Sequence, residues 1–284
     1  MKQEYLELLH KVLGNDAKVV SELVGGMMNE AYIVQNKEGK FVYYISTAQA
    51  NEMVDRDLEK ETQNIAYSLG LTSENVYFDK KNGIKINRFL EGDSLNHLSD
   101  FDYQKVAKLL ASYHGSNKKA SVYYDPLGRL ENYKKEALTH TQKLSEKFED
   151  FYEIVQKNRG FLLSQKTTLA HNDAQRSNIV KSGDNYYLID FEFAANNDPI
   201  YDIATFGNGD ALEGKKLLEE YEKIVPVEDG LKRYALWRID ISLQWYLVAL
   251  IKHYRGEGKI HGIDFLAVGE HFLNVAEQAK QLLN

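Results

Sequence analysis

The order of residue patterns along the chain constrains its fold more than any other feature. Stretches of branched and aromatic residues, broken by Gly- and Asn-containing turns, end near residue 90, and helical spacing of apolar residues dominates afterwards. The strand-like stretches are Val19–Val24, Ala31–Gln35, Phe41–Ile45, Val76–Phe78 and Ile84–Phe89. We therefore predict an α+β fold with a small antiparallel sheet first and a larger, mostly helical part after it.

Helical spacing continues through most of the second part. Residues 131–164 are expected to be helical throughout, and nearly all residues from 212 onward as well. The later strands are expected to be short, near Thr168–Ala170, Ile179–Val180 and Tyr186–Ile189.

The pattern changes at Glu91-Gly92, which we interpret as the hinge between two lobes. The predicted lobes are residues 1–91 and residues 92–284.

Charge and composition exclude several classes of protein. The 284 residues carry a net charge of -7 and no cysteine, so we expect no disulfide framework, no thiolate metal site and no nucleic-acid partner. No apolar run has the roughly 20 residues of a membrane span, and the N-terminus lacks a signal-peptide pattern, so a cytoplasmic location is expected. The excess of carboxylates is compatible with a cationic substrate.

The segment from His171 to Asn178, followed by Ile189-Asp190-Phe191-Glu192, holds the side chains best suited to chemistry. Asp173 and Asn178 lie five residues apart in a predicted loop, and Asp190 follows twelve residues later at the end of a strand that folds back. Phosphoryl transfer needs such a set: one carboxylate accepts the proton of the attacking hydroxyl, and oxygen ligands hold Mg²⁺. Asp173 is the predicted base, and Asn178 and Asp190 are the predicted magnesium ligands.

The alternative interpretation makes these residues turn formers and caps, which Asp and Asn often are. The combined order of an Asp, an Asn and a second Asp around a strand–turn–strand unit favours the catalytic interpretation. For His171 alone, we expect it to brace the loop through hydrogen bonds rather than to accept a proton.

This motif, with Asp-Phe-Glu where protein kinases have Asp-Phe-Gly, resembles the choline/ethanolamine kinases of the bacterial type, within the aminoglycoside phosphotransferase-like kinases. The resemblance is strongest from residue 169 to residue 206 and includes the segment 197–204. It implies a bilobal protein-kinase-like fold, ATP and Mg²⁺ as cofactors, and Asp202 as a brace for the catalytic loop.

The resemblance also places the nucleotide under the first lobe. Gly25 and Gly26 would lie in a loop over the phosphates, where glycines let backbone N–H groups approach closely, and Asn29 would steady that turn. Taken alone, the two glycines are more typical of a plain hairpin turn, and their position in the family pattern favours the phosphate loop.

Arg56 and Glu59 fall on the helix that the family places beside ATP, with Glu61 as the alternative to Glu59. The third strand departs from the family pattern, because Tyr44 stands where a Lys or Arg should contact the α- and β-phosphates. Lys40, Arg56 or another cation would have to supply this charge, or the protein is a degenerate kinase.

The acceptor site is expected to suit a cation. A quaternary ammonium group favours aromatic faces with a carboxylate nearby. The helix around Trp245 resembles the choline-binding helix of the family, although only one of its two usual tryptophans is present. Trp245, Tyr201 and Glu192 are the predicted substrate-binding residues, and a core position is the alternative for Trp245.

Three functions therefore stay open. The leading one is an ATP- and Mg²⁺-dependent kinase of choline or ethanolamine. The second is a kinase of another small alcohol, such as thiamine or an aminoglycoside. The third, suggested by Tyr44, is a kinase-fold binding protein without activity. The sequence does not indicate the oligomeric state.

Overall fold

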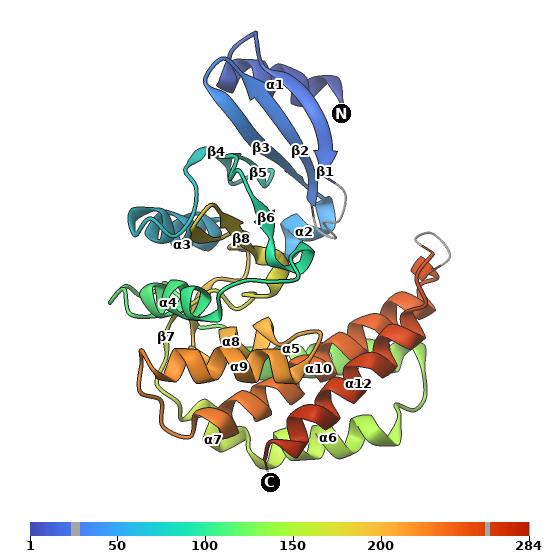
Figure 1. Cartoon of the computed structure of the whole chain (residues 1–284). Helices are drawn as coiled ribbons and strands as arrows, with labels where there is room; N and C mark the ends of the chain where they lie inside the picture. The colour runs from blue at the N-terminus through green and yellow to red at the C-terminus, as the bar shows by residue number, and fades with distance from the viewer. Residues whose placement is uncertain (24–28, 259–261, 284) are drawn as a thin grey trace.

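A computed structural model describes residues 1–23, 29–258 and 262–283 of the chain. Figure 1 shows an antiparallel sheet at one end of the molecule and a larger helical body at the other. The predicted α+β, kinase-like architecture is confirmed.

A five-stranded antiparallel sheet with the order β1-β2-β3-β5-β4 forms the small end. Its strands are β1 (Lys18–Leu23), β2 (Asn29–Asn36), β3 (Gly39–Ser46), β4 (Asn75–Asp79) and β5 (Ile84–Arg88). All five strands were predicted within one or two residues of these ends. Strand β3 is central, and it pairs with β2 on one side and with β5 on the other.

The first helix, α1 (Gln3–Leu13), covers this sheet (Figure 1). Leu9 and Leu13 on its apolar side are buried with Val34, Phe41 and Ile86 of the sheet in one hydrophobic cluster. The alternation of buried and less buried positions in β2 and β3 has the period of a sheet with one face on a core.

Two helices leave the sheet at the side that faces the larger body. They are α2 (Ala48–Met53) and α3 (Arg56–Ser68). Asp55 caps α3 by accepting hydrogen bonds from the backbone N–H groups of Asp57 and Leu58. Leu58 and Ala66 of α3 belong to the main hydrophobic core of the larger body, so this helix bridges the two parts.

Helices dominate the rest of the chain. They are α4 (Tyr103–His114), α5 (Pro126–His140), α6 (Glu146–Lys157), α7 (Arg159–Leu163), α8 (Ile200–Phe206), α9 (Ala211–Glu222), α10 (Gly230–Tyr254) and α12 (Phe265–Gln281). The expectation of one helix over 131–164 is wrong. Helix α5 ends where Thr141 is extended, and the Ser145 side chain caps α6 by accepting from the N–H of Phe148, which starts a new helix.

Short strands and two 3₁₀ turns connect these helices. The strands form two small sheets: β6 (Asp93–Ser94), β8 (Ile179–Ser182) and β9 (Asn185–Leu188) in one, and β7 (Thr168–Ala170) with β10 (Ala195–Asn197) in the other. The 3₁₀ turns are Leu95–His97 and Arg176–Asn178. Three of these strands were predicted; the two- and three-residue strands β6 and β10 were not.

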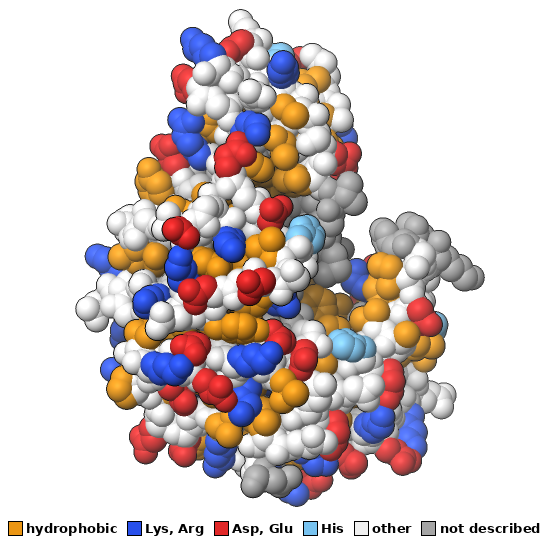
Figure 2. Space-filling model, viewed as in Figure 1, with side chains coloured by type: hydrophobic (Ala, Val, Ile, Leu, Met, Phe, Trp, Pro, Cys, Tyr) orange, Lys and Arg blue, Asp and Glu red, His pale blue; other side chains and the backbone are white. Residues whose placement is uncertain are grey.

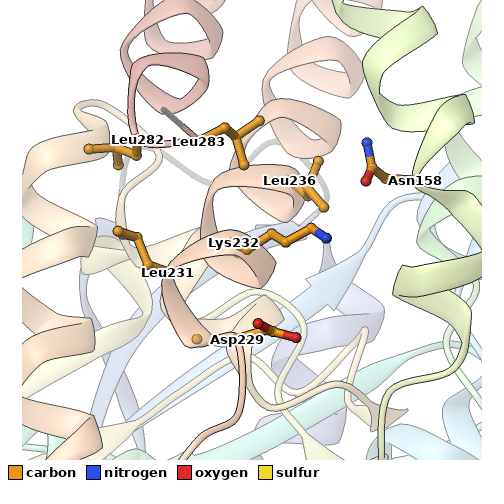
Figure 3. A pocket seen from close by; sticks show the side chains of 8 residues that line it. Asn158, Asp229, Leu231, Lys232, Leu236, Leu282 and Leu283 are labelled. Atoms are coloured by element: carbon orange, nitrogen blue, oxygen red, sulfur yellow. The ribbon is translucent and has the colours of Figure 1, made fainter.

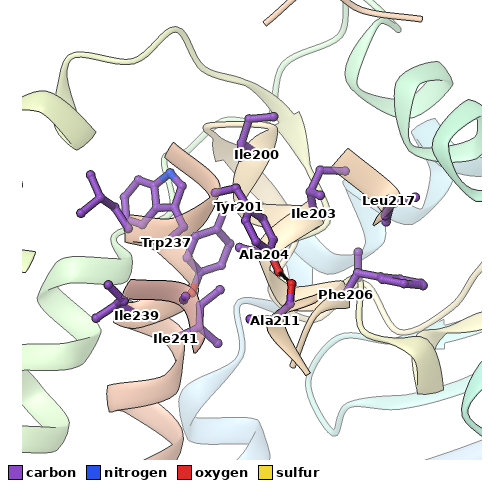
Figure 4. Close-up of a cluster of buried hydrophobic side chains, with 14 of the residues drawn as sticks. Ile200, Tyr201, Ile203, Ala204, Phe206, Ala211, Leu217, Trp237, Ile239 and Ile241 are labelled. Atoms are coloured by element: carbon purple, nitrogen blue, oxygen red, sulfur yellow. Dashed lines mark hydrogen bonds between the residues drawn. The ribbon is translucent and has the colours of Figure 1, made fainter. Parts of the chain in front are cut away.

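Helix α10 lies at the centre of the larger body. Most of its residues from Arg233 to Gln244 are buried, because α5, α8 and α12 pack against different sides of it. Figure 4 shows one of these contacts, where Trp237 of α10 lies beside Tyr201 of α8. None of the described helices is both long and apolar enough to cross a membrane.

The surface shows mixed charge. On the face in Figure 2, acidic and basic side chains are interspersed, without a broad area of one sign. At the predicted hinge, a Cβ on Gly92 would come within 2.0 Å of the Lys181 carbonyl oxygen, so this position requires a residue without a side chain. The division into lobes 1–91 and 92–284 stays a prediction.

Candidate active site

The loop after β7 brings two of the predicted catalytic residues into direct contact. The Asn178 side-chain N–H₂ group donates to Asp173 Oδ2 at 2.8 Å and to the Asp173 carbonyl oxygen at 2.9 Å. Gln175 Nε2 also donates to Asp173 Oδ2, at 3.2 Å. Both donors hold one oxygen of the Asp173 carboxylate, which leaves the other for a substrate hydroxyl.

The strand–turn–strand unit brings Asp190 to the same place. Gly183, with φ of +56°, forms the turn between β8 and β9, and the backbone N–H of Ile189 then donates to the Asn178 carbonyl oxygen at 3.0 Å. Asp190 itself adopts a left-handed conformation, with φ of +66°. A non-glycine residue there carries a cost of about 1 kcal/mol, and such strain gathers at functional sites.

Two side chains tie the catalytic loop to the Asp190 segment. The His171 Nε2–H donates to the Ile189 carbonyl oxygen at 2.9 Å, and the Asn172 amide donates to the Phe193 carbonyl oxygen at 2.9 Å. Burial lowers the pKa of His171. The neutral ring with its proton on Nε2 therefore braces the loop, as predicted for this residue.

Asp202 at the start of α8 holds the loop from below. Its carboxylate accepts hydrogen bonds from the backbone N–H groups of His171 and Asn172, at 2.8 and 2.6 Å, and a bond of 2.9 Å joins it to His114 Nε2. Asp202 is fully buried. The predicted brace is confirmed.

The electrostatics of Asp173 suit a base. Burial, followed by the charge of Asp190, raises the pKa of Asp173 to about 7. A carboxylate with a pKa in this range is a stronger proton acceptor than one at the usual value near 4.

The residues present fit a magnesium ion. Asp190 Oδ1 is buried and accepts no hydrogen bond, and the nitrogen of the Asn178 amide is engaged by Asp173, which leaves the amide oxygen for a cation. Within residues 1–23, 29–258 and 262–283, no three His, Asp or Glu side chains gather around one point. The candidate ligands are thus one carboxylate and one amide, with the remaining positions left to phosphate and water, as is usual for Mg²⁺.

A buried network of opposite charges lies above Asp190. Glu59 on α3 is 1 % exposed; its Oε1 lies 2.5 Å from Lys85 Nζ and its Oε2 lies 2.5 Å from Arg56 Nη1. Burial alone would raise the pKa of Glu59, but the charges of Lys85 and Arg56 lower it. The alternative helix residue, Glu61, is exposed and receives a bond from Ser121. Glu59 is therefore the helix glutamate that faces the site.

Lys85 is the functional candidate that sequence reasoning missed. Its Nζ lies 3.5 Å from Asp190 Oδ1, and the Tyr44 ring centroid is 4.9 Å from the same nitrogen. Lys40, one of the cations considered, is instead paired with Glu91 at the surface. The signal was present in the sequence, because a lysine between Ile84 and Ile86 in a buried strand needs a charged partner.

The predicted phosphate loop is only partly visible. Gly25 and Gly26 lie outside the described residues. Asn29 opens β2, and its Oδ1 is buried without a hydrogen-bond partner. Its role beside the nucleotide stays a prediction.

On the acceptor side, Glu192 is buried beside the metal-site residues. Its Oε2 has no hydrogen-bond partner, and burial, followed by the charge of Asp190, raises its pKa to about 8. The predicted ligand Tyr201 is 2 % exposed, and its ring centroid lies 5.5 Å from that of Tyr124 and 5.4 Å from that of Trp237. Figure 4 shows the contact with Trp237. Tyr201 is therefore a buried residue that packs against the Tyr124 ring rather than an exposed residue of the acceptor site.

Trp245 stands apart from this group. Its ring stacks on Phe272 of α12, with centroids 5.6 Å apart. Trp245 follows Trp237 by eight residues, which in a helix rotates the side chain by about 80° around the axis. The structure thus shows Trp245 packing against α12, and its predicted contact with substrate stays untested.

Three aromatic rings near the loop surround a cation of the chain itself. The Arg129 guanidinium carbon lies 4.5 Å from the Phe193 ring centroid, 5.4 Å from that of Tyr124 and 5.6 Å from that of Tyr133. Rings at these distances attract cations. The positive charge of Arg129 also lowers the pKa of Asp173, an effect that is outweighed there by burial, so this aromatic group lies on the catalytic side.

A second missed residue is Asp240 on α10. It is fully buried, its Oδ2 accepts from Gln244 at 2.7 Å, and its Oδ1 has no partner. Burial raises its pKa to about 8. An acid between Ile239 and Ile241 was the available signal.

A cavity of about 620 Å³ lies far from this chemistry. Asp229, Lys232 and Leu236 of the α10 region line it together with Asn158 and the C-terminal Leu282 and Leu283 (Figure 3). In Figure 1 these elements lie at the end of the larger body opposite the sheet. None of the predicted site residues contributes to it.

Comparison with known proteins agrees with the site. A family model described as choline/ethanolamine kinase matches residues 20–224. Protein LicA of Haemophilus influenzae is 27 % identical over 267 residues, covering 82 % of this chain and 74 % of that protein.

Among solved structures, choline kinase LicA from Streptococcus pneumoniae superimposes with a TM-score of 0.74 at 23 % identity, over 99 % of each chain. A structure of LicA in complex with AMP gives a TM-score of 0.73 at 24 % identity, over 100 % of this chain and 98 % of that one.

The matched residues include the network around Lys85, the catalytic loop and Asp190, and the segment before residue 20 and the helices after residue 224 lie beyond them. Shared sequence and shared geometry therefore coincide at the phosphoryl-transfer site. The chain belongs to the choline/ethanolamine kinase family and is a small-molecule kinase.

Proposed function

We propose that this kinase transfers the γ-phosphoryl group of ATP, with Mg²⁺, to the hydroxyl of choline or ethanolamine. The observation that carries the proposal is the Asp173–Asn178 hydrogen bond in a loop that the backbone of Ile189 joins, with the Glu59–Lys85 ion pair beside Asp190. Phosphoryl transfer depends on such positioning of charge more than on covalent chemistry.

Each residue then has a distinct task. The substrate oxygen attacks the γ-phosphorus while its proton passes to the free oxygen of Asp173, and the bond from the γ-phosphorus to the β,γ-bridging oxygen breaks to release ADP. Asn178 and Asp190 would hold Mg²⁺, which neutralises phosphate charge when bound. Gln175 and Asn178 keep Asp173 in one orientation through their hydrogen bonds.

The acceptor side favours a cation. Glu192 offers a buried carboxylate oxygen without a partner, and the Phe193 and Tyr124 rings, which contact the Arg129 guanidinium, are aromatic faces that accept a cation. A carboxylate combined with aromatic rings is the usual environment for an ammonium group that cannot donate hydrogen bonds. The names of the relatives, a choline kinase and a nucleotide complex among them, support the same substrates.

A coupled assay of ADP release tests the proposal. We expect magnesium-dependent turnover with choline or ethanolamine, and much less with thiamine or aminoglycosides. Turnover with thiamine or an aminoglycoside alone would replace the acceptor. No turnover with any acceptor, together with no thermal stabilisation by Mg-ATP, would favour a binding protein without activity.

Glu192→Gln tests the acceptor contact. Removing the charge should raise KM for choline by about tenfold, in the range of a charge-assisted contact, and leave KM for ATP nearly unchanged. An equal rise in both constants would remove Glu192 from the acceptor site.

A further inference from the structure

We propose that Lys85 on β5 supplies the positive charge for the α- and β-phosphates of the nucleotide, in place of the basic residue expected at position 44 of β3. This inference rests on the nucleotide site of the proposed function. It assigns a binding role to a lysine on a different strand from the expected one.

Strand register explains how the charge reaches the same place. Tyr44 and Lys85 are direct cross-strand partners in the β3–β5 ladder. Side chains at such positions share one face of the sheet, with Cβ atoms about 5 Å apart. A lysine side chain is longer than this separation, so its ammonium group from position 85 can occupy the space that a residue at position 44 would fill.

The contacts of Lys85 point to the phosphates. Its Nζ lies between Glu59 Oε1, at 2.5 Å, and Asp190 Oδ1, at 3.5 Å. Glu59 comes from the helix beside the nucleotide, and Asp190 is the proposed magnesium ligand. A cation between these two side chains lies where the phosphates must pass to reach the ion.

Neutralisation of Glu59 alone does not account for Lys85. Arg56 already pairs with Glu59 Oε2 at 2.5 Å, and its other two nitrogens bond Asn51 and Ser46. A buried lysine costs several kcal/mol to desolvate, so a second cation on one carboxylate is expensive without a further partner. Lys85 has three N–H donors but makes one hydrogen bond, to Glu59, which leaves donors for phosphate oxygens.

The other nearby cations are less suited. Arg56 has all three of its nitrogens engaged by protein groups. The Lys40 side chain is 41 % exposed and points to Glu91. Among the described residues, Lys85 is the lysine or arginine that forms an ion pair with Asp190.

The first experiment is calorimetric titration of Lys85→Met with Mg-ADP and, separately, with adenosine. A lost phosphate contact should weaken Mg-ADP binding by about tenfold or more, in the range of a charge-assisted hydrogen bond. Adenosine has no phosphates, so its affinity should stay within about twofold of that of the unaltered protein. An unchanged Mg-ADP affinity, or equal losses for both ligands, would refute the inference.

The second experiment moves the positive charge from position 85 to position 44. In the double variant Tyr44→Lys/Lys85→Met, the cross-strand neighbour carries the ammonium group, and Mg-ADP affinity should recover to within about threefold of the unaltered protein. Tyr44→Phe is the matched control, since it keeps the ring and should leave the affinity unchanged. A folded double variant without recovery would contradict the exchange between the two positions.

Folding is controlled separately. If Lys85→Met fails to fold, Lys85→Met/Glu59→Gln removes the unpaired acid, and its Mg-ADP and adenosine affinities are compared with those of Glu59→Gln alone. The same selective loss of Mg-ADP binding is expected, and its absence would refute the inference. These titrations contain no acceptor, so their outcome does not depend on whether choline is the substrate. A wrong acceptor would leave the inference intact, and a missing phosphate contact would refute the inference without changing the proposed acceptor.

Discussion

The buried carboxylates of the molecule differ in whether their oxygens have partners within the chain. On the nucleotide side, Glu59 is matched by Lys85 and Arg56, with every carboxylate oxygen paired. By contrast, Glu192, the predicted acceptor contact, and Asp240, at the centre of the helical body, each keep a buried oxygen without a hydrogen-bond partner. The chain thus supplies two cations for Glu59, whereas Glu192 keeps a buried oxygen that accepts no hydrogen bond from the described residues.

The largest effect is expected where the two sides meet, at Asp173. Asp173→Asn should lower kcat by about 10²–10⁴-fold, because a positioned base is lost, while Mg-ATP binding and the melting temperature stay close to those of the unaltered protein. Turnover assays and calorimetry on the same preparation measure both. Retention of most activity would show that another group accepts the proton.

The comparison itself is tested by two matched substitutions. Glu59→Gln leaves two buried cations without their acid and should lower the free energy of unfolding by about 3 kcal/mol or more. Glu192 forms no ion pair with the described residues, so Glu192→Gln should be neutral or stabilising. Denaturant unfolding of both variants gives the values, and equal destabilisation would mean that the two sides do not differ.

The buried carboxyl group of Asp240 should make the free energy of unfolding depend on pH. Burial raises its pKa to about 8, with Gln244 and Arg238 opposing that rise. Because the folded state holds a proton that the unfolded state loses near pH 4, the free energy of unfolding should fall as pH rises from about 4 to about 8. The fall should be on the order of a few kcal/mol and should level off above the folded pKa.

Asp240→Asn should remove this contribution and make the protein more stable than the unaltered chain at pH 8.5. Denaturant unfolding at several pH values measures it. If the variant shows the same slope between pH 5 and pH 8, Asp240 is not the group that titrates.

The smallest effect is expected at Trp245, the predicted substrate ligand that packs against α12. Its stacking on Phe272 predicts that Trp245→Phe changes KM for choline by less than about twofold. A rise of tenfold or more, with an unchanged melting temperature, would restore Trp245 as a substrate ligand.

Most of the fold was predictable because it depends on local pattern. The five strands of the sheet alternate or carry branched residues, and α3 begins at a capping Asp55, so periodicity located them. The break between α5 and α6 was missed, because residues 141–145 contain no Gly or Pro and only the Ser145 cap marks the new helix.

The catalytic loop was predictable from spacing, since Asp173, Asn178 and Asp190 are joined by short segments. Lys85 and Asp240 were not found, because their importance comes from contacts across the fold: Lys85 meets Glu59 across a strand–helix contact, and Asp240 lies buried at the centre of the helical body. Trp245 was chosen by family resemblance alone, and its environment depends on α12, which the sequence could not orient.

The pairing of positions 44 and 85 has a consequence for how relatives of this chain are judged. A single alignment column cannot report whether such a kinase keeps its phosphate-binding charge, because two columns share one physical location. Relatives with a basic residue in either column would keep the phosphate-binding charge, and only relatives that lack both would be expected to be inactive. Substitutions at the two columns should therefore have compensated one another during divergence.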